Sequence, residues 1–308
     1  MYKRFFRFKF LNNDTLLKNT FFQMKIINLF LTSAFLVTHY SCFTTHTQPE
    51  KENMFPEVGS PIQLVDNGKE HFFASYTGIN SFDSSERYAT VLETDIKYKL
   101  ADNVNEPATL GLVDLNTKEF IPLTKTRAWN FQQGCMAFWL GTSPDSLIIY
   151  NDFRNGKYVS VIMNVHTKKE IKTIPYPVSD VSDDGKTAVS INFSRLRIVR
   201  AGYGYSGDGQ DARAGIVYPQ DDGISIINLE TGEAKLILTN YQVKNLVPPL
   251  SEGGKAWFNH TKLNKNGTKL FFFSRQQAPS DLLRHTTSFT INTDGTNLQK
   301  CFPDDVNW

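Results

Sequence analysis

The sequence predicts an all-β fold, a β-propeller with four recognisable blades, and repeated turn signals support this prediction. A phrase of the Asn-Leu-Glu-Thr-Gly-Glu type returns four times along the chain. Its copies align on Thr117, Thr167, Thr231 and Gly295. Repeats at this spacing, with strand-like residues between them, are typical of four-stranded blades and not of one continuous sheet.

A second turn signal falls near the middle of each unit. Clusters of Asp, Glu, Asn, Ser, Lys, Pro and Gly occupy residues 83–86, 143–146, 182–185 and 264–267. Such clusters supply the preset or positive-φ turns that hairpins need. Strand-like apolar runs follow them at residues 88–92, 147–150, 187–191 and 270–273. Each unit therefore carries two hairpin turns at corresponding places.

The blades follow in chain order at about residues 69–128, 129–176, 177–242 and 255–302. The third contains a glycine-, tyrosine- and charge-rich insertion at residues 197–222, and long insertions of this kind tend to be functional loops. No sustained apolar repeat at helical spacing occurs after residue 45, which predicts an all-β fold. Because a ring pairs its last blade with its first, we expect either a four-bladed ring or, preferably, an incomplete propeller of about six to eight blades.

The N-terminal residues predict export. Residues 24–42 have the form of a signal peptide, with an apolar stretch shorter than the roughly 20 residues of a membrane-spanning helix. Residues 1–23 fit either an upstream start codon assigned in error or an extended basic leader. Residues 43–60 suit a polar tether, and the propeller domain is expected over residues 61–308.

Cys42 follows the apolar stretch at the place where bacterial lipoproteins carry their lipidated cysteine. Ser41 suits such a lipobox, whereas His39 and Tyr40 depart from it. We therefore expect lipidation at Cys42 and a location in the periplasm or at the outer membrane, with a plain secreted protein as the alternative. The other two cysteines, Cys135 and Cys301, are expected to be buried thiols without a disulfide or a cysteine-based metal site.

Charge and length limit the partners. The chain has 33 Lys and Arg against 31 Asp and Glu and a net charge of +2, with no basic block outside the leader. Nucleic acid is therefore not an expected partner. Membrane contact is expected only through the lipid anchor. The 308 residues suffice for one well-buried domain.

The stretch at residues 127–139 leads into the innermost strand of the second blade. Innermost strands line the central channel of a propeller, so the amides of Asn130, Gln132 and Gln133 are candidates for binding a ligand. The alternative is that these amides satisfy backbone groups at a blade junction.

The insertion and the residues just before it bring arginines and tyrosines close together in sequence: Arg195, Arg197, Arg200, Tyr203 and Tyr205. A guanidinium binds a carboxylate through two hydrogen bonds, and a tyrosine ring offers a stacking face to a sugar. This combination favours an anionic saccharide. The alternative is a solvated loop whose arginines pair with Asp208, Asp211 and Asp221.

The stretch at residues 257–260, Trp-Phe-Asn-His, opens the fourth blade. Its Asn259 is a candidate for substrate binding, and its His260 is a candidate metal ligand or general base. A structural histidine is the alternative, because His260, His71 and His285 form none of the paired patterns of metal sites. The chain has no Gly-rich phosphate loop and no Gly-x-Ser-x-Gly motif.

With these motifs and the turns at residues 143–146, 182–185 and 264–267, residues 69–302 resemble the TolB-like propellers and the related oligogalacturonate lyases of the bacterial cell envelope. The resemblance implies a channel that meets an acidic sugar and, in the lyases, a divalent metal held by several histidines and a glutamine. In this chain His260 lies in a stretch that looks like one of those ligand strands. The metal implied is manganese or calcium, and the implied catalytic residues are His260 and Arg195.

The sequence hypothesis is therefore an exported, lipid-anchored propeller that binds an acidic oligosaccharide such as oligogalacturonate. Cleavage by a metal-dependent lyase reaction is an open extension of this hypothesis. The alternative is a non-catalytic propeller that binds a protein partner at the cell envelope.

Overall fold

The computed structural model describes residues 65–303 except 66, 77, 97–98, 100–104, 201, 207–210 and 282–283. The chain divides into two units, residues 1–60 and residues 61–308, and every described residue belongs to the second. The expected signal peptide, the tether, Cys42 and Asp208 lie outside the described residues.

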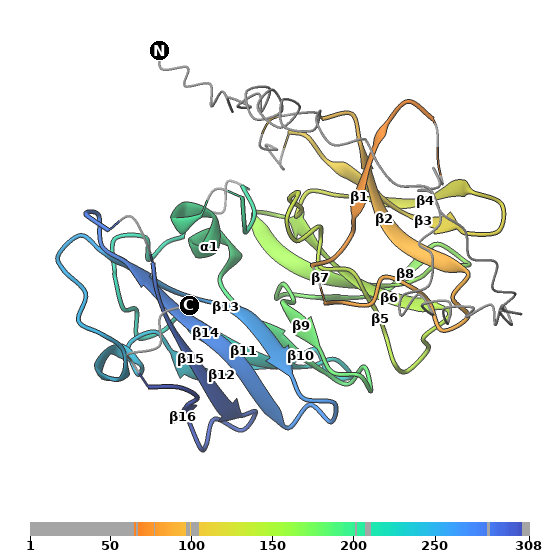
Figure 1. Cartoon of the computed structure of the whole chain (residues 1–308). Coiled ribbons are helices and arrows are strands. Elements are labelled where there is room, and N and C mark those ends of the chain that lie inside the picture. Colours follow the sequence, from red (N-terminus) through yellow and green to blue (C-terminus); the bar gives the residue numbers. More distant parts are fainter. Residues whose placement is uncertain are drawn as a thin grey trace, which may run out of the picture. The chain divides into compact units, whose positions relative to one another are not determined.

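The described strands form four antiparallel sheets, each of which joins four strands in chain order (Figure 1). The first contains β1 (Glu70–Phe73), β2 (Tyr88–Thr94), β3 (Ala108–Asp114) and β4 (Glu119–Thr126). The second contains β5 (Phe138–Trp139), β6 (Leu147–Arg154), β7 (Lys157–Asn164) and β8 (Lys169–Ile174). The third contains β9 (Asp180–Val181), β10 (Thr187–Ser190), β11 (Gly223–Asn228) and β12 (Ala234–Thr239). The fourth contains β13 (Lys255–Leu263), β14 (Lys269–Gln277), β15 (His285–Asn292) and β16 (Gln299–Lys300).

These sheets are the blades of a β-propeller, and they confirm the four predicted blades close to their predicted boundaries. The expectation of further blades concerns residues outside this chain and stays a prediction.

The repeated Thr-Gly or Thr-Lys phrase forms the turn between the third and fourth strands of a blade. Gly232 has a φ of 83° there, a value that glycine adopts without strain. In the first two blades, Lys118 and Lys168 occupy the same turn position with φ values of 61° and 55°. The repeated phrase therefore adopts the same turn geometry in these three blades.

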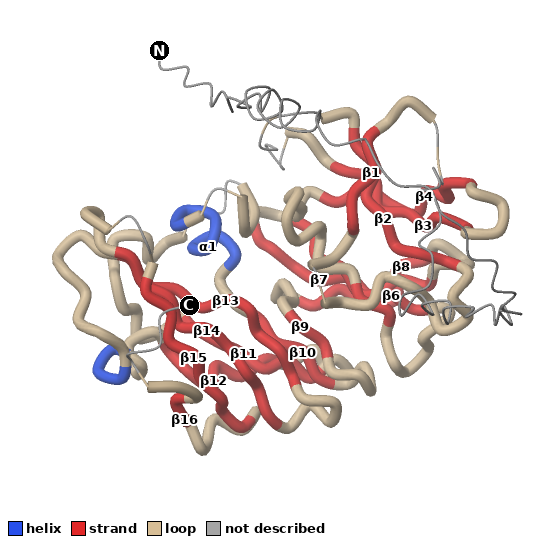
Figure 2. The backbone as a smooth tube through the Cα atoms, viewed as in Figure 1, coloured by secondary structure: helices blue, strands red, loops and turns tan. Residues whose placement is uncertain are grey.

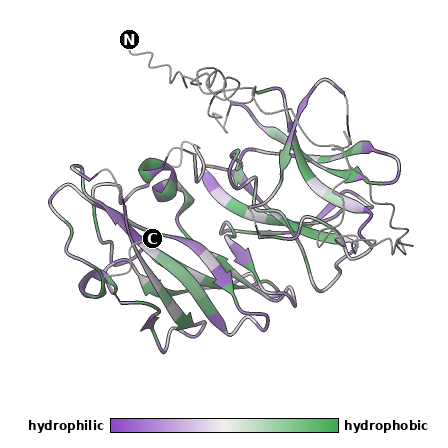
Figure 3. Cartoon of the chain, in the orientation of Figure 1, coloured by the Kyte–Doolittle hydropathy of each residue, from purple (hydrophilic) through white to green (hydrophobic). Residues whose placement is uncertain are grey.

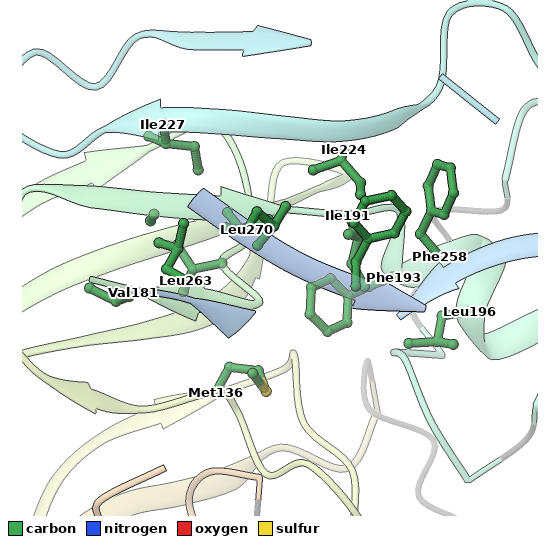
Figure 4. Packing of buried hydrophobic residues seen from close by; sticks show 14 of the residues in the cluster. Met136, Val181, Ile191, Phe193, Leu196, Ile224, Ile227, Phe258, Leu263 and Leu270 are labelled. Carbon is green, nitrogen blue, oxygen red and sulfur yellow. The ribbon is translucent and has the colours of Figure 1, made fainter. Parts of the chain in front are cut away.

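Two buried apolar clusters hold the blades together. One joins blades 1 and 2 and includes Leu92, Leu110, Trp129 and Ile148. The other joins blades 2, 3 and 4, and Figure 4 shows part of it. Hydrophobic colour runs along strands of all four blades in Figure 3, as expected for sheets that pack face to face. Each fully buried large apolar side chain contributes about 1.5 to 3 kcal/mol.

The fold is all-β as predicted, apart from two short segments. The helix α1 (Phe193–Val199) follows β10, and a 3-10 turn, η1 (Lys244–Leu246), follows β12 (Figure 2). Asn192 caps α1 by accepting a hydrogen bond from the backbone N–H of Arg195 at 2.9 Å. A helix of seven residues is too short to show the periodic apolar pattern on which the prediction rested.

Among the described residues, the helices are too short and too polar to cross a bilayer.

Candidate functional site

The first strands of the four blades, and the segments beside them, meet around a cavity with a volume of 160 Å³. All four blades line it. Tyr76 follows β1, Gln133 precedes β5, Asp180 begins β9, and His260 lies within β13. The volume is close to the roughly 150 Å³ that admits a benzene-sized ring. The cavity therefore has room for one small cyclic group.

A bulge in β13 sets the position of His260. The register of β13 with β14 shifts between Asn259 and Lys262, and His260 has a φ of 51°. A bulge of this kind bends a strand and redirects a side chain. The imidazole packs 5.3 Å from the ring of Tyr76 and 5.3 Å from the ring of Phe273, measured between ring centroids.

His260 is neutral at pH 7. Burial lowers its pKa to about 4, and the nearby positive charges of Arg275 and Arg200 act in the same direction. Among the described residues, no group hydrogen-bonds to either ring nitrogen of His260. Both nitrogens are therefore available to a ligand, one as a donor and one as an acceptor.

Two arginines lie beside this histidine without an acidic partner. The Arg275 guanidinium carbon lies 5.0 Å from the centre of the Phe273 ring, and the Arg200 guanidinium carbon lies 4.8 Å from the centre of the Tyr203 ring. No carboxylate of the described residues forms an ion pair with either arginine. Burial lowers the pKa of Arg275, and the charge of Arg200 lowers it further. The Arg275 guanidinium nevertheless stays charged at pH 7.

Tyrosines connect these groups across the blades. The hydroxyl groups of Tyr76 and Tyr203 are 3.3 Å apart, and the ring of Tyr203 lies 6.3 Å from that of His260. The backbone N–H of Tyr203 donates to the carbonyl of Arg200 at 2.9 Å, which holds the two residues in one turn. We call Arg200, Tyr203, His260, Phe273 and Arg275 the arginine cluster.

Unpartnered polar atoms lie on the same face of blade 4. Trp257 pairs with Arg275 and Asn259 pairs with Phe273 in the β13–β14 register, so the side chains of all four point to one side. The indole N–H of Trp257, both amide atoms of Asn259 and Nε of Arg275 are buried without a hydrogen-bond partner. Native proteins leave few such groups unsatisfied, and a polar ligand or water would satisfy them.

Arg195 has the opposite environment. It lies in α1, only 4% exposed, and its guanidinium donates to Asp211 at 3.0 Å. Four further bonds go to the backbone carbonyls of Ala256, Arg213, Ile216 and Val217. These contacts use the donors of the guanidinium and tie the insertion to β13. Arg195 thus pairs with Asp211 as the alternative expected, but from a buried position in a helix and not from a solvated loop. Arg213 pairs with Asp221 at 2.6 Å.

The amides before β5 have separate roles. The Asn130 side chain accepts from the backbone of Gln132 and Gln133 and donates to the carbonyl of Gly204 at 2.9 Å. Gln133 accepts from the N–H of Gly204 at 3.2 Å and also lines the cavity. Gln132 is exposed. Asn130 thus matches the junction alternative, whereas Gln133 is placed for both roles.

Gly204 lets the insertion reach this junction. It has a φ of 67°, and a Cβ built there would lie 2.2 Å from the carbonyl oxygen of Phe193. The neighbouring Tyr205 is 1% exposed, stacks on Phe193 with centroids 4.6 Å apart, and accepts from Asn151 at 2.9 Å. Tyr205 is therefore part of the core, while Tyr203 reaches the arginine cluster.

Sequence reasoning missed Tyr76, Arg275 and Asp180. The sequence places Tyr76 and Arg275 in ordinary strand-like surroundings, and no local signal sets them apart. Arg200 was named only as part of the insertion. These residues come from three blades and meet only in the folded protein. The order of residues along the chain does not show that they meet.

The residues around His260 do not fit a divalent metal. The described residues contain no group of three or more His, Cys, Asp or Glu side chains that could hold one. His260 is surrounded by aromatic rings and by two positive charges, which repel a cation. Cys135 is buried and Cys301 half-buried, both as free thiols.

The fold and the site together define a β-propeller with a small cavity at the meeting point of its blades, lined by apolar and polar residues. No family model matches the sequence, and no curated protein matches it.

Solved structures with a similar fold include a protein described as TolB from Agrobacterium tumefaciens, at 11% identity and a TM-score of 0.40, over 72% of this chain and 63% of that one. TolB from Acinetobacter baumannii has 11% identity and a TM-score of 0.42, over 78% of this chain and 45% of that one. A periplasmic gluconolactonase from Pseudomonas aeruginosa has 9% identity and a TM-score of 0.33, over 75% and 81%. The chain thus spans 63% and 45% of the lengths of the two TolB chains.

Proposed function

We propose that this propeller binds an acidic saccharide at the arginine cluster, as an exported, lipid-anchored binding protein. The observation that carries the proposal is the pair of guanidinium groups, Arg200 and Arg275, which lie near each other and near His260 without an acidic partner. Two like charges in a partly buried place repel, and a bound carboxylate would offset both.

The neighbouring groups suit a sugar. Tyr76 and Tyr203 offer hydroxyl groups that lie 3.3 Å apart, and His260 offers a neutral donor and acceptor. The buried amide of Asn259 and the indole N–H of Trp257 lack partners. A uronic acid carries a carboxylate, several hydroxyl groups and an apolar ring face, and so would complement this set.

The proposal is for binding and not for catalysis. A lyase needs a strong enough general base beside its substrate, and burial lowers the pKa of His260, which weakens it as a base. The metal-dependent reaction would also need ligands that the surroundings of His260 do not supply. Arg195, the other implied catalytic residue, is engaged in five bonds within the protein.

The test is calorimetric titration of trigalacturonate into the wild type, Arg200→Met and Arg275→Met. Losing a hydrogen bond to a charged group costs about 1.5 to 3 kcal/mol, so each variant should bind on the order of tenfold to hundredfold more weakly. Arg87→Met is the matched control, because Arg87 is a surface arginine that pairs with Asp114 at 2.7 Å. Its affinity should equal that of the wild type.

Three outcomes bear on the proposal. Equal affinity for trigalacturonate and a neutral maltotriose would contradict recognition of the carboxylate. Binding that requires manganese or calcium would support the hypothesis of a metal-dependent lyase instead. If the wild type does not bind, the saccharide hypothesis is wrong, and binding of a protein partner at the cell envelope becomes the better hypothesis.

A further inference from the structure

The cavity beside the arginine cluster is a second compartment, lined by both apolar and polar groups. His260 belongs to both, and Tyr76, which lines the cavity, contacts His260 and Tyr203 of the cluster. On the cavity side, the polar lining comes from Gln133, Ser179, Asp180, Thr261 and Lys262. The cavity side contains no arginine, whereas the cluster contains two. The two compartments therefore favour different parts of a ligand.

Hydroxyl and amide groups on the cavity side are placed to bind hydroxyl groups. The Ser179 and Thr261 hydroxyl oxygens are 2.8 Å apart, and Ser179 also donates to the carbonyl of Val189 at 3.2 Å. Thr261 therefore donates to Ser179, which leaves lone pairs on both oxygens as acceptors.

Gln133 adds a donor to the same compartment. Its Oε1 accepts from Gly204, which fixes the orientation of the amide. Its NH₂ group has no hydrogen-bond partner among the described residues, and Gln133 lines the cavity. This donor is therefore available to a polar group in the cavity.

Asp180 completes the lining. Its carboxylate accepts from the Lys262 side chain at 3.2 Å and from the backbone N–H of Leu263 at 2.5 Å. Each carboxylate oxygen has room for one more donor. Burial raises the pKa of Asp180 while Lys262 opposes that rise. Apolar contact comes from Met136, Ile79 and Ile191 on the same wall.

We infer that the cavity is a subsite for a second sugar unit, bound through its hydroxyl groups next to the unit whose carboxylate contacts the arginines. This inference rests on the proposed function. The ligand class is an oligosaccharide of at least two units. One unit is acidic, and the protein recognises its neighbour through the hydroxyl groups of that neighbour. The volume of 160 Å³ limits the subsite to a single ring.

The experiment compares galacturonate with a disaccharide that joins galacturonate to a neutral hexose, by calorimetric titration. The wild type should bind the disaccharide at least about tenfold more tightly than galacturonate, a difference of about 1.4 kcal/mol. Thr261→Val, which keeps the side-chain shape and removes the hydroxyl, should reduce this gain to less than about threefold. Ile79→Trp, which fills the cavity, should abolish the gain. Neither variant should change the affinity for galacturonate.

Ile216→Trp is the matched control, because Ile216 is 52% exposed and lies outside the cavity lining. It should keep the full gain. Galacturonate binding without a gain for the disaccharide would overturn this inference and leave the proposed function intact. A gain that persists in Ile79→Trp would overturn it as well. Failure of the wild type to bind either compound would overturn both.

Discussion

Arg195 and Arg200 lie at opposite ends of the same short helix and have opposite surroundings. Arg195 is buried and donates to one carboxylate and four carbonyl groups. Arg200 is half-buried, lies over the ring of Tyr203, and has no acidic partner among the described residues. Arg275, which reaches the same place from β14, shares that condition.

The difference shows which arginines hold the fold and which can hold a ligand. A guanidinium whose donors are all used inside the protein stabilises the structure but has nothing left for an anion. A guanidinium that is buried without a counter-charge destabilises the ligand-free protein. An anion that binds there supplies the counter-charge, and this favours binding. The same residue type therefore has two roles within one insertion, set by the contacts that the fold supplies.

The largest expected effect is on the buried arginine. Arg195→Met removes five hydrogen bonds and leaves Asp211 buried without its ion-pair partner. Breaking a buried pair in this way costs about 3 to 5 kcal/mol of the free energy of unfolding. Urea denaturation followed by tryptophan fluorescence measures it. The double variant Arg195→Met, Asp211→Leu should recover part of the loss, because no buried charge remains. If Arg195→Met is as stable as the wild type, Arg195 does not stabilise the fold, and the proposed difference between Arg195 and Arg200 is wrong.

The fold was largely predictable because its signals are local. Turn residues such as Gly185 and Gly267 take positive φ values of 67° and 65° where the sequence predicted hairpins. The runs after them became the strands β2, β6, β10 and β14. The helix α1 was missed because its seven residues are too few to show an apolar period.

The site was predictable only in part. The sequence indicated His260, Asn259 and Tyr203, and the structure brings His260 and Tyr203 together with Arg200. It also indicated Arg195 and Tyr205, which bond inside the protein instead. Whether an arginine is satisfied depends on carbonyl groups far along the chain, such as that of Ala256. No spacing rule in the sequence contains that information.

A smaller effect concerns pH and the histidine beside the unpaired arginines. The unfolded chain holds His260 near its ordinary pKa of about 6.5, whereas the folded pKa is about 4. Between these values the unfolded state binds more protons. The contribution of His260 to stability is therefore full above about pH 6.5 and is lost as the pH falls toward 4.

His260→Phe removes this contribution. The free energy of unfolding of the variant should depend less on pH between 4 and 6.5, by at most about 1.4 kcal/mol per pH unit relative to the wild type. Asp180 and Asp222, whose pKa values are raised by burial, remain in both proteins and cancel in the comparison. Parallel curves for the two proteins would contradict the assigned environment of His260.

The smallest effect concerns the stability of the arginine cluster itself. Arg275→Met replaces an unpaired guanidinium with an apolar side chain that packs on Phe273. The free energy of unfolding should stay unchanged or rise by up to about 1 kcal/mol, while affinity for the acidic saccharide falls. Thermal denaturation measures the first quantity. A loss of stability comparable to that of Arg195→Met would show that Arg275 is structural.

The most direct test of the arginine cluster is the pKa of His260, measured by NMR titration of the imidazole with and without saturating digalacturonate. In the free protein, burial and the charges of Arg275 and Arg200 place that pKa at about 4. A carboxylate bound between those arginines would offset their charges and raise the pKa of His260 by about one unit or more. The signal of His166, on the turn between β7 and β8, serves as the internal control. A saturated complex in which the pKa of His260 stays at its value in the free protein would contradict carboxylate binding at the arginine cluster.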